Sequence, residues 1–216
     1  MDNYLYLVEK MKNKTKMTKW LHEISFSGNL VELEPLNILH LDGLTEAVQD
    51  GNIWELWYTS APSIQNAESY ILKAIQEYDE DVSLPFAIID KKTKKVVGTT
   101  RYMNAVAKNR RLEIGTTWYA KSAQKTGINT ECKYLLLSYA FEDLQCIAVE
   151  FRTHFHNVDS RNAIARLGAK QDGILRNHSI DNTGHLRDTV VFSILDSEWK
   201  TVKKSLEFKM TRKYER

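Results

Sequence analysis

Hydrophobic and polar residues alternate in several short stretches, a pattern typical of strands that bury one face. Between residues 30 and 36, Val31 and Leu33 alternate with Glu32 and Glu34. The same reasoning predicts strands over 84–90, 96–103, 110–119, 147–153, 173–179 and 187–195. On the strand over 110–119 we expect one face to carry Leu112, Ile114, Thr116 and Trp118.

Apolar residues spaced three and four apart predict helices in the remaining stretches. Two of these helices cover residues 38–48 and 66–78, and another covers 157–167 and ends at Gly168, because glycine favours a helix stop. The final helix begins near Asp196 or Ser197. A further helix has its apolar positions at Ile128, Cys132, Leu135, Leu136 and Tyr139.

The order of these elements predicts an α/β fold with a single mixed central sheet. Three consecutive strands form an antiparallel meander, and the strand–helix–strand step after them favours a parallel pair. The chain contains neither an internal repeat nor a linker rich in Pro, Gly or Ser. We therefore predict one domain over 29–208, with a basic extension over 1–28 and a basic tail over 209–216.

Composition agrees with a folded domain, because 43% of the 216 residues are hydrophobic and 27% are charged. The net charge of +2 conceals basic ends, since residues 200–216 hold seven Lys and Arg against two Glu. A basic end can contact nucleic acid. We favour the interpretation of solvated chain ends, and we expect no nucleic-acid partner.

Two cysteines, Cys132 and Cys146, are too few for a disulfide framework or a zinc site. We expect both to be buried as small hydrophobic residues in a reducing compartment. No run of 18 apolar residues is present, and the first residues lack the order of a secretory signal. We therefore predict a cytoplasmic protein without a membrane partner or a bound metal.

The most informative segment, residues 118–131, lies between a predicted strand end and a helix start. Gly127 tolerates a positive φ, and the first helical turn offers unpaired N–H groups at the positive end of the dipole. Such a turn binds anions and suits a pyrophosphate, with Lys121 and Lys125 adding positive charge. An ordinary helix start, capped by Asn129 or Thr130, fits the same residues.

The sequence resembles the GNAT superfamily of acyl-CoA N-acyltransferases, in particular its RimJ/RimL-like branch. The family's pyrophosphate loop reads Arg/Gln-x-x-Gly-x-Gly/Ala, which here corresponds to Gln124–Asn129, with Asn129 where a small residue is usual. The likeness covers about residues 29–206. Its other motifs are Gly127–Lys133, Asn157–Arg161, Leu167–Ala169, Gly173–His178, Arg187-Asp188 and Glu198-Trp199.

The resemblance implies the GNAT fold, whose sheet is splayed between two parallel strands, and it implies acetyl-CoA as cosubstrate. The main-chain groups of Trp118 and Ala120 are then expected to pair with the pantetheine arm. An amide near Trp118 is expected to polarise the thioester carbonyl. The pyrophosphate is expected to be held by the amides of Gln124, Lys125, Thr126, Gly127, Ile128, Asn129 and Thr130.

The resemblance also suggests residues for the acyl-transfer step. Asn157 matches the family's Asn that contacts the pantetheine arm, and it suits the N-cap of the next helix equally well. Ser160, one turn later, is placed to reach the thiol. Many members have a Tyr as general acid where this chain has Ile164. Ser160 or water must therefore protonate the leaving thiolate.

Glu113 is the best candidate for the base, because it lies mid-strand and points away from Leu112 and Ile114. The alternative is an exposed or ion-paired Glu113 beside Arg110 and Arg111. His178 and Glu150 are second choices for the base. His154 and His156 are too closely spaced in a predicted loop to indicate a metal site.

The acceptor amine is expected on the side of the first two helices. Candidate contacts there are Trp54, from an aromatic loop over 52–59, and Tyr102, Arg176 and His178. Trp54 fits the acceptor side and the core equally well. For Trp57 we favour the core.

These observations together predict an N-acetyltransferase that moves an acetyl group from acetyl-CoA to a primary amine. The acceptor is a protein N-terminus, as in the ribosomal-protein branch, or a small molecule. Two alternatives remain open: a non-catalytic acyl-CoA-binding or regulatory module, and a transferase for a larger acyl group. An exposed strand edge also leaves a homodimer open.

Overall fold

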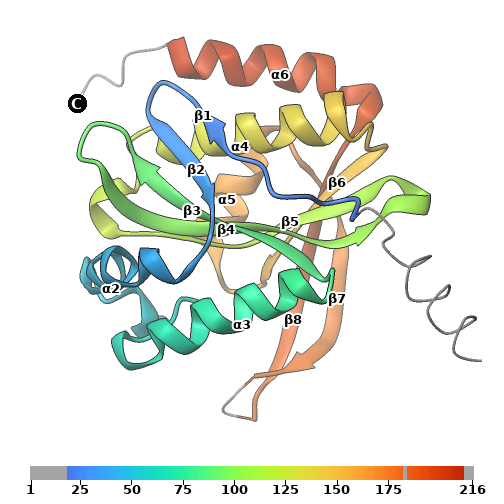
Figure 1. Cartoon of the computed structure of the whole chain (residues 1–216). Coiled ribbons are helices and arrows are strands. Elements are labelled where there is room, and N and C mark those ends of the chain that lie inside the picture. Colours follow the sequence, from blue (N-terminus) through green and yellow to red (C-terminus); the bar gives the residue numbers. More distant parts are fainter. Residues whose placement is uncertain (1–18, 182–183, 212–216) are drawn as a thin grey trace, which may run out of the picture.

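The computed structural model describes residues 19–181 and 184–211, which form a single eight-stranded sheet flanked by helices (Figure 1). In space the strands follow the order β1-β2-β3-β4-β5-β6-β8-β7. All neighbours are antiparallel except β5 and β6, so the predicted parallel pair is confirmed. The strands are β1 (Phe26–Ser27), β2 (Val31–Pro35), β3 (Ser83–Asp90), β4 (Lys95–Val106), β5 (Arg111–Tyr119), β6 (Ala148–His154), β7 (Lys170–Ile180) and β8 (Leu186–Leu195).

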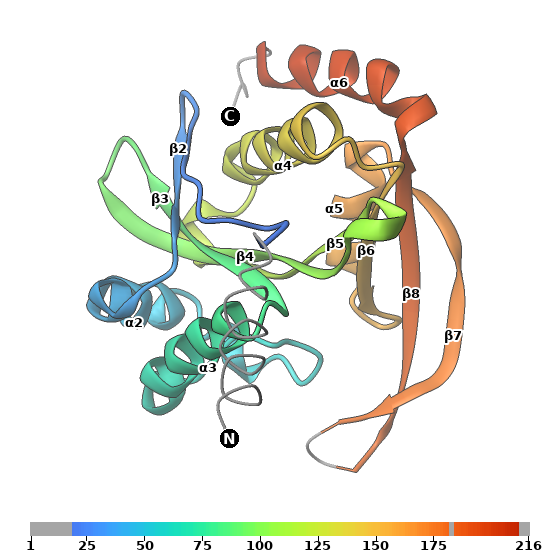
Figure 2. The ribbon, with the colours of Figure 1, turned by 45° about the vertical axis from the view of Figure 1, so that its right-hand side comes forward.

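Helices cover both faces of this sheet. On one face α2 (Leu41–Gln49) packs against β4, and α3 (Ala67–Asp79) packs against β3. On the other face α4 (Ile128–Ser138) lies between the sheet and α6 (Asp196–Thr211), as Figure 2 shows. The fifth helix, α5 (Val158–Leu167), contacts β6 and β8. Short 3-10 helices cover Ile38–His40, Ile53–Glu55, Ile64–Asn66, Ala107–Asn109 and Lys121–Ala123, and a π-helical turn, Tyr139–Asp143, extends α4.

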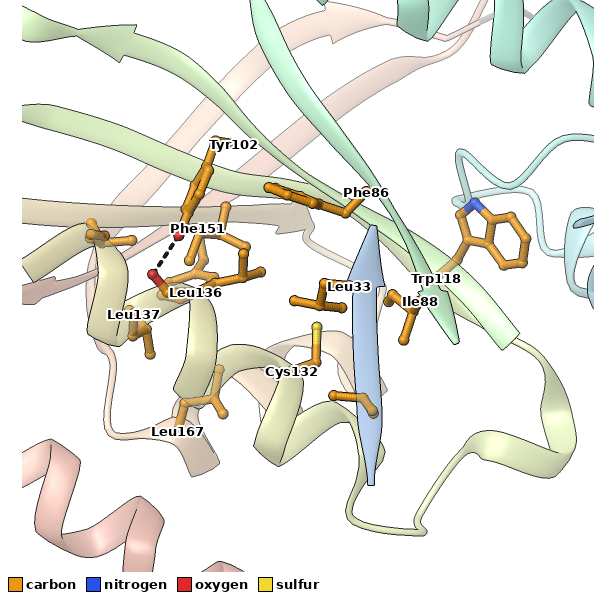
Figure 3. Packing of buried hydrophobic residues seen from close by; sticks show 14 of the residues in the cluster. Leu33, Phe86, Ile88, Tyr102, Trp118, Cys132, Leu136, Leu137, Phe151 and Leu167 are labelled. Atoms are coloured by element: carbon orange, nitrogen blue, oxygen red, sulfur yellow. Dashed lines mark hydrogen bonds between the residues drawn. The ribbon is translucent and has the colours of Figure 1, made fainter. Parts of the chain in front are cut away.

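The main core lies between the sheet and α4 (Figure 3). Its fully buried side chains include Leu33 and Phe86 from the strands and Cys132 and Leu136 from the helix. Tyr102 belongs to the same core, and its hydroxyl donates a hydrogen bond to the Leu136 carbonyl at 2.5 Å. The apolar spacing of residues 128–139 therefore predicted the sheet-facing side of α4 correctly.

The predicted end of α5 is confirmed at Gly168, which has a φ of +105°. A side chain at this position would be strained, because non-glycine residues rarely adopt a left-handed conformation. A Cβ there would also lie 3.1 Å from Cγ2 of Val202 in α6. The glycine thus ends the helix and lets α6 approach closely.

A bulge in β5 changes which side chains face each helix layer. Trp118 pairs with Thr99, but Gly115 pairs with Arg101, so β5 carries one more residue than β4 across this interval. Thr116 within the bulge has a φ of +47°. Beyond it, Thr117 faces α4, whereas the Trp118 indole donates to Tyr70 of α3 at 3.4 Å. The prediction that Trp118 shares a face with Leu112 is therefore wrong, because an added residue reverses the alternation.

The described part of the N-terminal segment lies against the domain. Leu21 is buried, and the Phe26 ring packs against Phe86 and Tyr139. Residues 1–18 and 212–216 lie outside the described ranges, so the expected boundaries at 28/29 and 208/209 stay predictions. Within the described ranges, no helix has the length and apolar character to cross a bilayer.

Candidate functional site

The sheet opens where β5 and β6 run parallel. Their pairing is limited to three positions, Arg111 with Ala148, Leu112 with Val149 and Glu113 with Glu150. Both strands then continue, to Tyr119 and His154, without pairing with each other. Each therefore presents main-chain N–H and C=O groups to a gap in the sheet, where an extended ligand can pair with them.

Hydrogen bonding identifies which groups of β5 face this gap. The Ala120 N–H donates to the Val97 carbonyl of β4 at 2.8 Å, and the Ala120 carbonyl accepts from Ala123 N–H at 3.0 Å. Because successive residues of a strand point their main-chain groups to opposite sides, Trp118 also points toward β4. The expectation that Trp118 and Ala120 pair with the pantetheine arm is thus wrong by one residue. The groups on the gap side belong to Thr117 and Tyr119.

The loop after β5 has the form of an anion site. Gly127 is the N-cap of α4 with a φ of +100°, and no side chain caps the helix. Thr126 Oγ1 donates to the Ala123 carbonyl at 2.6 Å and so holds the turn. The first main-chain bond into the helix runs from Glu131 N–H to the Gly127 carbonyl at 3.1 Å. Ile128 N–H makes only a long hydrogen bond, 3.5 Å, to Thr126 Oγ1. The N–H groups of Asn129 and Thr130 have no acceptor among the described residues, so the first turn can bind an anion.

The alternative of a helix start capped by Asn129 or Thr130 is wrong. The Thr130 side chain is buried, and its hydroxyl accepts a hydrogen bond from Arg166 of α5 at 2.8 Å. Gln124 Nε2 donates to the Tyr119 carbonyl at 3.2 Å, which ties the loop to the gap-facing end of β5. Lys121 and Lys125 are exposed, so both can approach an anion bound at the loop.

Glu113 lies at the last paired position of β5, where the gap begins. Only 5% of the residue is exposed, and it lines a cavity of about 370 Å³. Its carboxylate accepts a hydrogen bond from Asn104 Nδ2 at 2.8 Å and lies 3.4 Å from Arg152 Nε. The cavity is lined by Asn104, Val106, Asn109, Arg111, Leu112, Glu113, Glu150 and Arg152.

The two carboxylates at this point of the sheet have different proton affinities. Burial raises the pKa of the Glu113 carboxyl, although the hydrogen bond from Asn104 and the charge of Arg152 oppose the rise. Burial acts on Glu150 in the same direction, but hydrogen bonds from Arg152 and Arg111 outweigh it and lower that pKa. Glu113 is therefore the better proton acceptor. Its ionic partner is Arg152 rather than Arg110 or Arg111.

The start of α5 follows the free end of β6. Asn157 caps the helix, because its Oδ1 accepts from the Ser160 N–H at 3.0 Å. The N-cap interpretation of Asn157 is thus confirmed, while the contact with a pantetheine arm stays a prediction. Ser160 is partly exposed one turn along, and Ile164 is buried.

The aromatic loop after α2 reaches the end of β6. Trp57 is 62% exposed, so its assignment to the core is wrong, and its ring packs edge-on against His154 with 4.7 Å between centroids. Trp54 is half-buried against the core. Burial and the charge of Arg187 lower the pKa of His154. Its Nδ1 accepts from the His156 N–H at 3.1 Å, so the ring is neutral with its proton on Nε2.

The other acceptor candidates are spread over three environments. Tyr102 is fully buried in the core, so the structure contradicts its expected role in the acceptor cleft. Arg176 is exposed on β7 and pairs with Asp188 at 2.5 Å. His178 Nδ1 lies 3.2 Å from Thr189 Oγ1, and Thr189 pairs with His154 across β8 and β6. His178 thus lies near the end of β6.

Sequence reasoning missed two buried charged residues of α4, Glu131 and Lys133. Glu131 accepts hydrogen bonds from three main-chain N–H groups of the turn between β1 and β2. Lys133 contacts hydroxyls of β4 and β5. Residues 131 and 133 flank Cys132, which lies on the predicted apolar face of the helix. That position beside a buried residue was the available sign that the two charged side chains are buried. Among the described residues, no three His, Cys, Asp or Glu side chains are grouped to hold a metal ion.

Comparisons with known proteins agree with this geometry. The family model described as "Acetyltransferase (GNAT) domain" matches residues 31–170. "Putative ribosomal N-acetyltransferase YdaF" of Bacillus subtilis (strain 168) is 36% identical over 92 residues, which cover 43% of this chain and 49% of YdaF. The match therefore spans only about half the length of that relative.

Solved structures extend the likeness over most of the chain. A GCN5-related N-acetyltransferase from Brucella melitensis is 32% identical with a TM-score of 0.80, covering 88% of this chain and 87% of the other. RimJ of Mycobacterium smegmatis, solved in complex with CoA-disulfide, has a TM-score of 0.69 at 22% identity. That comparison covers 83% of this chain and 88% of RimJ, and it supports the fold alone.

Proposed function

This chain belongs to the GNAT acetyltransferase family, and we propose that it transfers the acetyl group of acetyl-CoA directly to a primary amine. The observation that carries the proposal is the gap between β5 and β6, together with the start of α4, which has no side-chain cap from its N-cap residue and is reached through the loop after β5. An extended pantetheine arm suits the gap by main-chain pairing, and a diphosphate suits the helix start by charge. The RimJ structure with a bound CoA derivative has the same fold.

The Thr117 and Tyr119 main chain pairs with the pantetheine arm, while the loop from Gln124 to Thr130 holds the diphosphate. With the arm in the gap, the thioester carbonyl lies beside the bulge of β5. The Thr117 N–H donates to its oxygen and stabilises the negative charge that develops there during attack. Holding the amine against this carbonyl supplies a large part of the acceleration.

Glu113 acts as the base. It takes a proton from the acceptor ammonium, directly or through one water molecule, and its raised pKa favours this transfer near neutral pH. The neutral amine then attacks the carbonyl carbon, so that the C–N bond forms and the C–S bond breaks. The attacking nitrogen gives up its second proton as the intermediate collapses. The thiolate of CoA takes a proton from Ser160 or from water, and that donor is reprotonated by the proton from the nitrogen. Asn157 contacts the pantetheine arm beside it.

The acceptor is a protein N-terminus or a small primary amine that enters beside the aromatic loop. Its contacts are Trp54, Arg176 and His178, together with the exposed ring of Trp57. The ribosomal acceptor in the name of YdaF makes a protein N-terminus the first substrate to test.

Two further expectations accompany this function. We propose a cytoplasmic enzyme, because both cysteines are buried free thiols and so fit a reducing compartment. We also keep a homodimer as a proposal, since β7 lies at the edge of the sheet and offers its outer side for pairing.

The test is a screen of amines with acetyl-CoA, in which thiol release reports turnover and mass spectrometry identifies the acetylated product. The panel includes peptides with the N-termini of ribosomal proteins, polyamines and amino acids. Propionyl-CoA and succinyl-CoA run in parallel to distinguish an acetyl donor from a larger acyl donor. Tight binding of acetyl-CoA without turnover on any amine would instead favour the non-catalytic module.

Replacing Gly127 by alanine is expected to weaken acetyl-CoA binding about tenfold, because a Cβ at φ +100° forces the loop away from its anion-binding form. The measurement is the Kd from isothermal titration calorimetry. Gly184→Ala is the matched control, since Gly184 also has a positive φ, +87°, but lies in the turn between β7 and β8 with open space around it. Equal Kd values for both variants would exclude the loop as the diphosphate site.

A further inference from the structure

Lys133 is a buried cation to which the proposed mechanism assigns no role. It lies on α4 with 4% of its surface exposed. Its Nζ donates to Thr117 Oγ1 of β5 at 2.7 Å and to Thr100 Oγ1 of β4 at 2.9 Å. Among the described residues, its hydrogen-bond partners are these two hydroxyls, and no carboxylate acts on its charge. Burying an ammonium group without a counter-ion costs folding free energy, which the hydrogen bonds to the two hydroxyls offset only in part.

The two hydroxyls connect Lys133 to the main chain of β5. Thr100 Oγ1 and Thr117 Oγ1 are 2.8 Å apart, and Thr117 Oγ1 donates to the Gly115 carbonyl at 3.3 Å. One set of proton positions satisfies every contact. Lys133 donates to both hydroxyls, Thr100 donates to Thr117, and Thr117 donates to Gly115. The chain of hydrogen bonds therefore runs from the interior of the protein to the bulge.

The bulge is a strained part of the strand that needs support. Thr116 has a φ of +47°, a left-handed conformation that β-branched residues rarely adopt. The hydrogen bonds of Lys133 and the Thr117 hydroxyl hold Gly115 and Thr117, the residues on either side of Thr116. This conformation directs the N–H of Thr117 toward the gap between β5 and β6, where its main-chain groups have no strand partner.

We propose that Lys133 is a positioning residue for acyl transfer: it holds the β5 bulge from the α4 side, so that the Thr117 N–H points at the thioester oxygen, and it adds positive charge behind that N–H. This inference rests on the proposed function. The ammonium group lies behind the Thr117 hydroxyl, so it favours negative charge on the oxygen without touching the reacting atoms. Burial lowers the pKa of Lys133 to about 8, and the group keeps its charge in most molecules at neutral pH.

The test compares Lys133→Met with Cys132→Ala. Methionine preserves most of the volume of the lysine side chain but removes its donors. Cys132→Ala disturbs the adjacent buried position of α4 without touching the hydroxyl chain. We expect Lys133→Met to lower kcat at least tenfold while KM for acetyl-CoA changes less than twofold. We expect Cys132→Ala to leave both values within twofold.

A spectroscopic readout does not depend on knowing the acceptor. Infrared difference spectra of bound acetyl-CoA labelled with ¹³C at the carbonyl report how strongly that carbonyl is polarised. We expect the band of the wild-type complex to lie below its position in solution and to return toward that position in Lys133→Met. Thr100→Val removes one hydroxyl from the chain of hydrogen bonds and is expected to shift the carbonyl band by an intermediate amount. It replaces Lys133→Met in the test if the methionine variant does not fold.

An unchanged carbonyl band together with an unchanged kcat in Lys133→Met would overturn the proposal. Parallel losses in Lys133→Met and Cys132→Ala would also overturn it, because they would indicate a packing defect. If the wild-type protein does not bind acetyl-CoA, the proposed function fails and this inference fails with it. If acetyl-CoA binds but no amine is acetylated, the band shift alone decides whether Lys133 acts on the carbonyl.

Discussion

Replacing Glu113 by glutamine is expected to lower kcat about a hundredfold while leaving the Kd of acetyl-CoA within twofold. Glutamine has nearly the same shape and can still accept from Asn104, but it cannot take the proton of the acceptor ammonium. The loop that we propose to hold the diphosphate does not involve Glu113. The loss should therefore fall on kcat, measured by thiol release at saturating acetyl-CoA.

The pH profile gives a second readout of the same variant. The base must be deprotonated to act, so kcat/KM of the wild-type enzyme should rise with pH through the pKa of Glu113. Because burial raises that pKa, the rise should lie at a higher pH than for an ordinary carboxyl group. In Glu113→Gln this limb should be missing.

Glu150→Gln separates proton transfer from the surrounding ionic network. Glu150 pairs directly with Glu113 in the parallel ladder and binds Arg111 and Arg152. If the network alone matters, the two variants should lose similar activity. We expect at most a few-fold loss in Glu150→Gln, and equal losses would remove Glu113 from the role of base.

Replacing Glu131 by alanine is expected to lower the free energy of unfolding by about 3 kcal/mol or more. Its buried carboxylate accepts the N–H groups of Asn29, Leu30 and Val31 at 2.8, 2.6 and 2.9 Å. Removal would leave three donors under α4 without an acceptor. The turn packs closely on this carboxyl group, since a Cβ on Gly28 would lie only 2.5 Å from the Glu131 carboxyl carbon.

Urea unfolding followed by circular dichroism measures this loss. Glu68→Ala is the matched control, because Glu68 also lies in the first turn of its helix but is exposed. Its loss should stay near 0.5 kcal/mol, which is typical of the interaction of a carboxylate with a helix dipole. Glu131→Gln retains one acceptor oxygen and should fall between the two. A loss below 1 kcal/mol in Glu131→Ala would mean that water replaces the carboxylate at the turn.

The sequence was informative where periodicity and chain connectivity decide the structure. Alternation located seven of the eight strands and missed only the two-residue β1, and the strand–helix–strand step predicted the parallel pair of β5 and β6. Gly127 marked the helix start at which we propose the anion site. In each of these cases the relevant information lies within a few neighbouring residues.

The bulge at Thr116 could not be foreseen, because nothing in a run of Thr, Thr and Trp indicates an added residue. It reversed the face of Trp118 relative to Leu112. The error is physical in origin: alternation holds only while each residue opposes one partner.

The burial of the charged side chains of Glu131 and Lys133 could not be predicted from a local sequence pattern either. Helix α4 is covered by the sheet on one side and by α6 on the other, so it buries more than one stripe of residues. Lys133 and Glu131 are buried for that reason, and their partners lie far away in sequence. Trp57 shows the converse. It belongs to an aromatic loop, and its side chain is nevertheless exposed, so an apolar residue in a loop need not enter the core.

The three-pair seam between β5 and β6 also affects the mechanics of the sheet. These three pairs are the strand pairing that joins a half made of β1 to β5 to a half made of β6, β8 and β7. A ligand lying in the gap acts as a substitute strand that bridges the halves. Amides near the open ends of β5 and β6 should then exchange hydrogen quickly in the free protein. They should exchange slowly once acetyl-CoA is bound, because the bound ligand restricts movement of the two halves.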